Sequence, residues 1–207
     1  MNQERKYRVI IGGGGTGGHV FPAISIANAL RDSEDNVEIL FVGARGKLEM
    51  EKVPEAGYEI KGLPVAGFQR RITWKNVTFF FKLMKSMSIS RKIIRDFKPD
   101  VVVGVGGYAS GPILKAAGRK GVPTLIQEQN SYAGVTNKLL SGKAAKICVA
   151  YEKMEKYFPA DKIILTGNPT RQNLVLPDKV KKESMDHFKL DPAKKVVLLI
   201  GGSLGAR

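Results

Sequence analysis

The chain has 207 residues, of which 43% are hydrophobic and 26% are charged, and its formal net charge is +15. This balance predicts a globular protein, and no apolar stretch approaches the roughly 18 residues of a membrane-spanning helix. The single cysteine and two histidines exclude a disulfide framework, as expected in a reducing cytoplasm, and leave no cluster for a metal ion. The excess of positive charge favours an anionic partner, which is nucleic acid, an anionic membrane or a phosphorylated substrate.

Short β-branched runs alternate with longer helical patterns along the chain, which is typical of parallel α/β units. The expected strands are Tyr7–Ile11, Val37–Val42, Tyr58–Leu63, Val101–Val105, Thr124–Gln127, Lys146–Val149 and Ile163–Leu165. The expected helices are Phe21–Leu30, Leu48–Glu55, Trp74–Phe97, Gly111–Gly118, Ala133–Leu140 and Tyr151–Tyr157. We therefore expect an α/β fold with a Rossmann-like parallel sheet and a binding crevice at the carboxyl ends of its strands.

The pattern changes after Leu165. The tripeptide Gly167-Asn168-Pro169 is typical of a turn, and Leu176–Lys195 is polar and rich in lysine. A further apolar run, Val196–Ile200, leads into a glycine-rich end. We expect residues 1–166 to form one domain, and residues 167–207 to be a linker and the beginning of a second α/β domain, cut off after its first strand.

A glycine-rich segment, Gly12–His19 (GGGGTGGH), directly follows the first expected strand. Glycines between a strand and a helix leave N–H groups free and let a phosphate approach the backbone, and the helix adds the positive end of its dipole. The segment matches the dinucleotide fingerprint, but Arg45 stands near the position of the fingerprint's acid and suits at best a 2′-phosphate. No Lys-Ser/Thr pair follows the glycines, which excludes a Walker A loop. A tight turn without a ligand is the structural alternative.

His19 is placed near the start of the first expected helix, within reach of a ligand held at the glycine segment. An imidazole can accept a proton near neutral pH. The pattern therefore favours chemistry on a phosphorylated ligand, with a purely structural histidine as the alternative.

Two further segments follow strands and should lie at the same edge of the sheet. Gly104–Pro112 (GVGGYASGP) is a second glycine-rich turn before a helix. Two such turns suggest a diphosphate or a second anionic ligand. Gln127–Gly134 (QEQNSYAG) supplies a carboxylate and amides that suit sugar hydroxyls or the orientation of His19. The alternatives are a surface aromatic at Tyr108 and a helix cap at Asn130.

Cations and aromatic residues are mixed between Lys61 and Lys98, where Asp96 is the single acid. Helical spacing predicts a buried face that consists of Val77, Phe80, Phe81, Met84 and Met87. The remaining aromatics beside lysines suit an anionic membrane surface, and the predicted membrane patch is Trp74, Lys75, Phe79 and Lys82. An ordinary core helix with solvated lysines is the alternative. Nucleic-acid binding is disfavoured, because no RNA- or DNA-binding pattern accompanies the charge.

Taken together, five segments resemble one bacterial family, the GT-B glycosyltransferases that make lipid II for peptidoglycan. The segments are Gly13–Pro22 (GGGTGGHVFP), Gly104–Pro112, Glu128–Gly134 with Thr136-Asn137-Lys138, Gly167–Arg171 (GNPTR) and Gly201–Arg207 (GGSLGAR). The resemblance implies two Rossmann-like domains, of which the first binds the lipid-linked acceptor and the second most of the sugar nucleotide. It implies inverting transfer of GlcNAc from UDP-GlcNAc to the C4 hydroxyl of MurNAc in undecaprenyl-linked lipid I, with no metal and no other cofactor.

The resemblance also implies roles for individual residues. His19 is the expected base, and Glu128 is expected beside it in the catalytic site. The expected donor contacts are Thr16, Gly17, Gly18, Asn130, Arg171 and Ser203, and the expected acceptor or pyrophosphate contacts are Gly14, Gly15, Gly106, Gly107 and Tyr108. The expected location is the cytoplasmic face of the bacterial inner membrane, as a peripheral protein. The alternatives are an NADP-dependent oxidoreductase and a non-catalytic fragment that binds acceptor or membrane.

Overall fold

The structure is a computed structural model of the chain that describes residues 5–65, 74–170, 178–191 and 193–198. Its internal contacts divide the chain into two units, Met1–Pro169 and Thr170–Arg207. The first unit contains a seven-stranded sheet, and the second contains helix α6, Asp178–His187. The division lies beside the turn expected at Gly167-Asn168-Pro169, while the roles of the two parts as separate domains stay a prediction.

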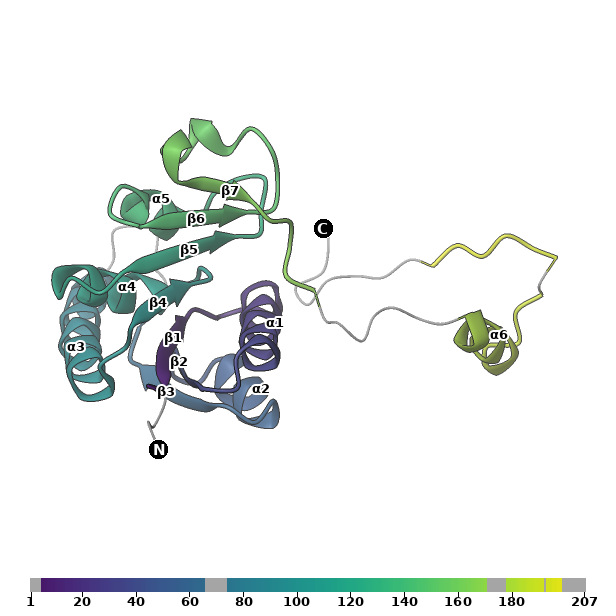
Figure 1. The fold of residues 1–207 in the computed structure, drawn as a ribbon, viewed down its shortest axis with the longest axis horizontal. Helices are drawn as coiled ribbons and strands as arrows, with labels where there is room; N and C mark the ends of the chain where they lie inside the picture. Colours follow the sequence, from purple (N-terminus) through teal and green to yellow (C-terminus); the bar gives the residue numbers. More distant parts are fainter. Residues whose placement is uncertain (1–4, 66–73, 171–177, 192, 199–207) are drawn as a thin grey trace. The chain divides into compact units, whose positions relative to one another are not determined.

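The sheet of the first unit is parallel throughout, in the order β3-β2-β1-β4-β5-β6-β7 (Figure 1). Its strands are β1 Tyr7–Gly12, β2 Val37–Ala44, β3 Glu59–Leu63, β4 Val101–Gly104, β5 Thr124–Glu128, β6 Lys146–Val149 and β7 Ile163–Leu165. The seven strands expected for this unit are all confirmed, with ends within two residues of the prediction. Because β1 pairs with both β2 and β4, the strand order reverses its direction there, and a ligand crevice is expected at such a point.

The connecting helices form where the sequence predicts them in all but one place, although the first begins four residues before Phe21 and ends three residues after Leu30. They are α1 Gly17–Ser33, α2 Glu49–Glu55, α3 Trp74–Phe97, α4 Ser110–Arg119 and α5 Val135–Ser141. The helix expected over Tyr151–Tyr157 was wrong, since only a short 3₁₀ turn, Met154–Lys156, forms there. Lys153 adopts φ +60°, a left-handed conformation that an α-helix of L-residues does not continue through.

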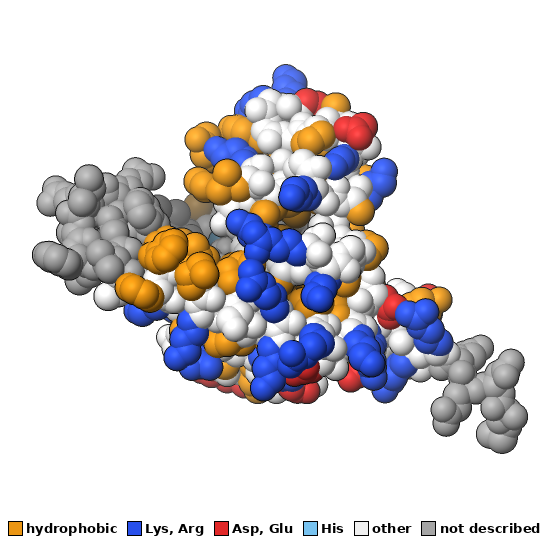
Figure 2. Space-filling model, turned by 90° about the vertical axis from the view of Figure 1, so that its left-hand side faces the viewer, with side chains coloured by type: hydrophobic (Ala, Val, Ile, Leu, Met, Phe, Trp, Pro, Cys, Tyr) orange, Lys and Arg blue, Asp and Glu red, His pale blue; other side chains and the backbone are white. Residues whose placement is uncertain are grey.

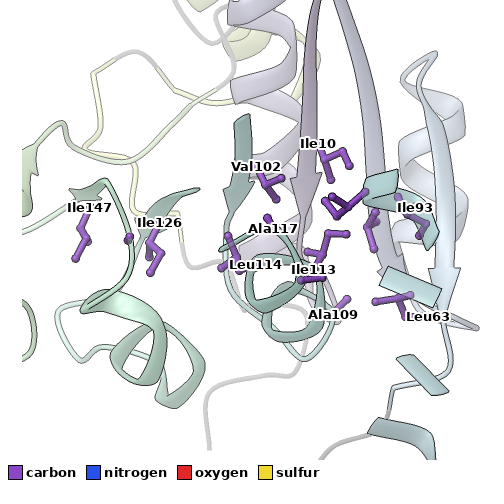
Figure 3. Close-up of a cluster of buried hydrophobic side chains, with 14 of the residues drawn as sticks. Ile10, Leu63, Ile93, Val102, Ala109, Ile113, Leu114, Ala117, Ile126 and Ile147 are labelled. Carbon is purple, nitrogen blue, oxygen red and sulfur yellow. The ribbon is translucent and has the colours of Figure 1, made fainter. Parts of the chain in front are cut away.

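The helices form a layer on each face of the sheet, with α1 and α2 on one face and α3, α4 and α5 on the other (Figure 1). Alternation along β1 sends Val9 and Ile11 toward the α1 side and Ile10 toward the α4 side. Figure 3 shows the buried cluster on the α4 side of the sheet, in which Ile113 and Leu114 of α4 lie beside strand residues. The sheet is therefore buried on both faces, as the apolar strands predicted.

The buried face of α3 differs from the prediction. Phe80, Phe81 and Met84 are exposed, so their assignment to a core face was wrong, while Met87 is buried as expected. The side chain of Val77 lies outside the described residues. The buried side of α3 contains two small polar residues, Ser86 and Ser90, together with Ile93 and Ile94. A pattern built on large apolar residues does not detect a helix that packs partly through serines.

The second unit contains the helix α6 within a stretch that was expected to be a polar linker, so this helix was not predicted. Most of its described side chains are exposed. The strand expected over Val196–Ile200 is absent from residues 196–198, and its last two residues lie outside the described part.

The described residues contain neither a candidate membrane span nor a candidate metal cluster. No helix in that part of the chain combines the length and apolar character needed to cross a bilayer. The same residues place no group of three His, Cys, Asp or Glu side chains where they could hold a metal ion. Cys148 of β6 is free and half-buried.

Candidate active site

Two glycine loops meet at the carboxyl edge of the sheet, because β1 and β4 are neighbouring strands. The first loop, residues 13–16, joins β1 to α1, and the second, residues 105–109, joins β4 to α4. The N–H of Val105 donates to Gly12 O at 3.0 Å, and the N–H of Gly14 donates to Gly106 O at 3.3 Å. The two loops expected at one edge are therefore in direct contact.

The contact between the loops requires glycine. Gly107 has φ +82°, and a Cβ at this position would overlap the carbonyl oxygen of Gly14. Gly106 has φ +95°, and a Cβ there would lie 2.6 Å from His19 Cδ2 and 2.8 Å from His19 Nε2. The imidazole edge that carries Nε2 thus lies directly against the second loop.

The N–H groups around the first loop fall into two sets. Those of residues 13–15 donate within the chain, and their acceptors are Val42 O, Gly106 O and Glu49 Oε2. Those of residues 16–18 donate to no residue that the structure describes, because they stand at the open N-terminal end of α1. A helix end of this kind favours an anion. Gly14 and Gly15 were expected to hold pyrophosphate, but their N–H groups already donate within the chain. The available donors are the next N–H groups along the chain, those of residues 16–18.

The second loop also offers donors. The N–H groups of Gly107 and Tyr108 have no acceptor among the described residues. Ser110 Oγ donates to Gly107 O at 2.9 Å and so holds the loop against the start of α4. The Tyr108 side chain is exposed.

His19 is the third residue of α1 and is half-buried. Its Nδ1 lies 3.1 Å from Thr16 Oγ1, a contact in which either group can donate. Burial lowers the pKa of His19 below its usual value of 6.5, and the negative charges of Glu128 and Glu49 oppose that shift. The imidazole is therefore neutral at physiological pH, which is the state that a general base needs.

Glu128 ends β5 and is buried, with 1% of its surface exposed. Its Oε1 accepts from the N–H and Nδ2 of Asn130 at 3.1 and 3.0 Å. Its Oε2 accepts from Gly134 N and from Asn137 Nδ2, both at 2.9 Å. The carboxylate thus organises the loop between β5 and α5, and its expected catalytic role stays a prediction. Asn137 belongs to one of the five family-like segments, but its spacing does not show the contact with Glu128, so the sequence predicts no role for it.

A second buried carboxylate, Glu49, was not predicted from the sequence. Its Oε1 accepts from Ala44 N and its Oε2 from Gly15 N, each at 2.8 Å. Glu49 stands in the charged run Glu49–Glu55, where nothing in the sequence distinguishes it from the exposed Glu51.

An apolar groove of about 960 Å³ lies between α3, α4 and α5. Phe79, Phe80 and Leu83 line one side, and Leu139 and Tyr108 also contribute. Four cations reach the groove as well, namely Arg91, Lys115, Arg119 and Lys143. Figure 2 shows the face that carries α3 and α4, where hydrophobic side chains stand among Lys and Arg side chains.

The other expected site residues are placed as follows. Of the expected membrane patch, Phe79 lines the groove, Lys82 is exposed on α3, and the side chains of Trp74 and Lys75 lie outside the described part. Asn130 is exposed, two residues after the end of β5. Arg171 and Ser203, expected to contact the donor, both lie outside the described residues.

The N-terminal domain of glycosyltransferase family 28 matches residues 9–149, a range that includes both glycine loops, His19 and Glu128. The chain belongs to glycosyltransferase family 28. This confirms the resemblance inferred from the five segments, and it favours a glycosyltransferase over an NADP-dependent oxidoreductase. Arg45, the residue on which the oxidoreductase hypothesis depended, donates from Nε to Gly62 O at 3.0 Å.

Curated relatives of this chain share one protein name, which states a reaction. The chain is 64% identical over 204 residues to the UDP-N-acetylglucosamine–N-acetylmuramyl-(pentapeptide) pyrophosphoryl-undecaprenol N-acetylglucosamine transferase of Phocaeicola vulgatus, a match that covers 99% of this chain and 54% of that protein. It is also 64% identical over 200 residues to the protein of the same name from Bacteroides fragilis, covering 97% of this chain and 53% of the relative. The chain therefore spans about half the length of the curated relatives it matches.

Solved structures confirm the expected fold class, the N-terminal half of a GT-B glycosyltransferase. MurG from Acinetobacter baumannii superposes with a TM-score of 0.65 at 30% identity, over 83% of this chain and 48% of that chain. The UDP-GlcNAc 2-epimerase from Neisseria meningitidis superposes with a TM-score of 0.58 at 14% identity, over 89% of this chain and 54% of that one. At 14% identity the second match concerns the fold alone.

Proposed function

We propose that the protein is a glycosyltransferase that moves GlcNAc from UDP-GlcNAc to the C4 hydroxyl of MurNAc in undecaprenyl-linked lipid I, which gives lipid II. The observation that carries this proposal is the position of His19 beside the free N–H groups of residues 16–18, where two glycine loops meet. The identity to N-acetylglucosamine transferases supports the choice of substrates. The proposal concerns this chain as the acceptor-binding part, acting with a second part that binds most of the UDP-sugar.

The proposed reaction is a single displacement. The 4-hydroxyl oxygen of MurNAc attacks the anomeric carbon of GlcNAc from the face opposite the diphosphate, so the bond from that carbon to the diphosphate oxygen breaks and the configuration inverts. His19 accepts the hydroxyl proton on Nε2, which carries a lone pair when Thr16 Oγ1 accepts from Nδ1–H. A positioned base of this kind contributes about 10²–10⁴-fold to the rate.

The departing UDP takes up negative charge as the bond breaks. The N–H groups of Thr16, Gly17 and Gly18 stand at the positive end of the α1 dipole and stabilise that charge. The resemblance adds Asn130, Arg171 and Ser203 as further donor contacts. The free N–H groups of Gly107 and Tyr108 suit the pyrophosphate of the acceptor, with Gly106 at the junction of the two loops. Glu128 holds the β5–α5 loop and places a negative charge near His19, rather than transferring a proton itself.

The groove between α3, α4 and α5 supports a peripheral position on an anionic membrane. Apolar side chains such as Phe80 and Met84 are exposed on α3, and Lys115 and Arg119 of α4 stand beside them. Aromatic and aliphatic side chains enter the headgroup region, while cations contact lipid phosphates. The proposed location is the cytoplasmic face of the inner membrane, where the acceptor's polyprenyl tail is anchored.

The decisive experiment measures GlcNAc transfer by the protein extended to the full length of its relatives. His19→Ala should reduce kcat by about 10²-fold or more, and His187→Ala, which changes the second histidine of the chain, should leave kcat near wild type. A His19→Ala enzyme with nearly full turnover would remove the base from the proposal.

A further inference from the structure

Glu49 is the first residue of α2, and its carboxylate is buried with 1% of the residue exposed. A buried carboxylate normally has a cationic partner or saturating hydrogen bonds. Among the described residues no lysine or arginine forms an ion pair with Glu49. Its negative charge is stabilised by backbone N–H groups instead, which ties the side chain to the main chain around it.

The two hydrogen bonds of Glu49 join the end of β2 to the first glycine loop. Oε1 accepts from Ala44 N and Oε2 accepts from Gly15 N, each at 2.8 Å. The loop also packs against the carboxylate, since a Cβ at Gly14 (φ +134°) would lie 2.7 Å from Oε2. Hydrogen bonds from N–H groups to a carboxylate are about twice as strong as neutral ones. Gly15 is therefore held at its N–H by a rigid, buried acceptor.

Gly15 directly precedes the part of the chain that contacts a ligand in the proposed function. The next residue, Thr16, lies beside His19 Nδ1, and residues 16–18 carry the free N–H groups. We propose that Glu49 is a positioning residue of the active site: its carboxylate fixes Gly15 and so sets the direction of the Thr16–Gly18 amides and of the Thr16 hydroxyl toward His19. Because the Gly15 N–H donates to Glu49, it cannot bind the diphosphate, and that role falls to the N–H groups of residues 16–18. The ligand part of this inference rests on the proposed function, while the loop geometry does not.

The role needs a carboxylate rather than any polar side chain. An ionised carboxylate has two acceptor oxygens, whereas an amide has one acceptor oxygen and an NH₂ donor. Glu49→Gln therefore keeps the size of the side chain, removes its charge and sets a donor against one of two N–H groups. Glu51→Gln is the matched control, because Glu51 lies on the same helix, is exposed and pairs with Lys52 at 2.9 Å.

The first test needs no ligand and uses NMR on the 207-residue chain. Glu49→Gln should speed the hydrogen exchange of the Gly15 amide by about tenfold or more, as a buried acceptor is lost. It should also lower the pKa of His19 further, because the negative charge of Glu49 opposes the lowering by burial. The chain has two histidines, so the His19 ring signal is readily assigned. Glu51→Gln should change neither quantity.

The second test measures binding of inorganic pyrophosphate to the same proteins by calorimetry. Glu49→Gln should weaken binding by about tenfold, because the loop then spends less time in the conformation that binds, and Glu51→Gln should bind like wild type.

If Glu49→Gln does not fold, Glu49→Asp replaces it in both tests, since aspartate retains the charge but is too short to reach both N–H groups. Unchanged Gly15 exchange and an unchanged His19 pKa would overturn the role of Glu49. A wild-type chain that binds no pyrophosphate would instead refute the proposed diphosphate site, and the NMR readouts would still decide on Glu49.

Discussion

The contact between the two glycine loops predicts that Gly107→Ala destabilises the protein. Gly107 has φ +82°, which costs an alanine about 1–2 kcal/mol. The new Cβ would also overlap Gly14 O and lie 3.0 Å from Gly14 C and 3.1 Å from Gly14 N, so one loop has to move. Overpacking of this kind costs about 1–3 kcal/mol. We expect the free energy of unfolding to fall by about 3 kcal/mol in total.

The matched control is Gly121→Ala. Gly121 has a similar φ of +74°, but apart from its chain neighbours no atom of the described residues lies within 4 Å of the position of its Cβ. This variant therefore reports the conformational cost alone, about 1 kcal/mol after the entropic gain from removing a glycine. Urea unfolding followed by circular dichroism gives both values, and the difference between the variants measures the steric contact. Equal losses for Gly107→Ala and Gly121→Ala would show that the two loops do not touch as described.

Three further predictions concern the site and the groove. Acidification below pH 6.5 should reduce the stability of the chain, because the lowered pKa of His19 lets the unfolded state bind a proton first. His19→Asn should flatten that slope in pH-dependent urea unfolding, and an unaltered slope would contradict the assigned shift. Lys115→Glu changes the local charge by two units and should weaken binding to phosphatidylglycerol vesicles by about tenfold or more, at about 1 kcal/mol for each charge near the surface. Lys47→Glu, on an exposed loop after β2, should bind like wild type. Equal binding by both variants would count against the groove. The 207-residue chain alone should show little or no GlcNAc transfer, and substantial turnover by it would contradict the assignment of donor binding to a second part.

The fold was largely predictable from the sequence because each signal was local. Apolar runs such as the one that forms β4, Val101–Gly104, correspond to strands buried on both faces, and glycine segments mark the turns after β1 and β4. The failures have physical causes of two kinds. Lys153 takes a left-handed conformation that no propensity indicates, and α3 packs partly through Ser86 and Ser90 rather than through its aromatic residues.

The residue types of the site were predictable, but the hydrogen bonds between them were not. The sequence placed His19, Glu128 and both glycine loops at one edge, and the structure agrees with that placement. It did not show which N–H groups are already occupied, because the acceptor for Gly15 is Glu49, 34 residues away. A side chain that acts through long-range hydrogen bonds to the backbone leaves no spacing or periodicity to detect.

A crystal structure of the full-length protein with UDP-GlcNAc and a lipid I analogue tests the proposed site most directly. We expect diphosphate oxygens within hydrogen-bond distance of the N–H groups of residues 16–18. We also expect the MurNAc 4-hydroxyl about 2.6–3.2 Å from His19 Nε2. A complex in which the phosphates lie away from Thr16–Gly18, with the hydroxyl out of reach of the imidazole, would contradict the proposed site.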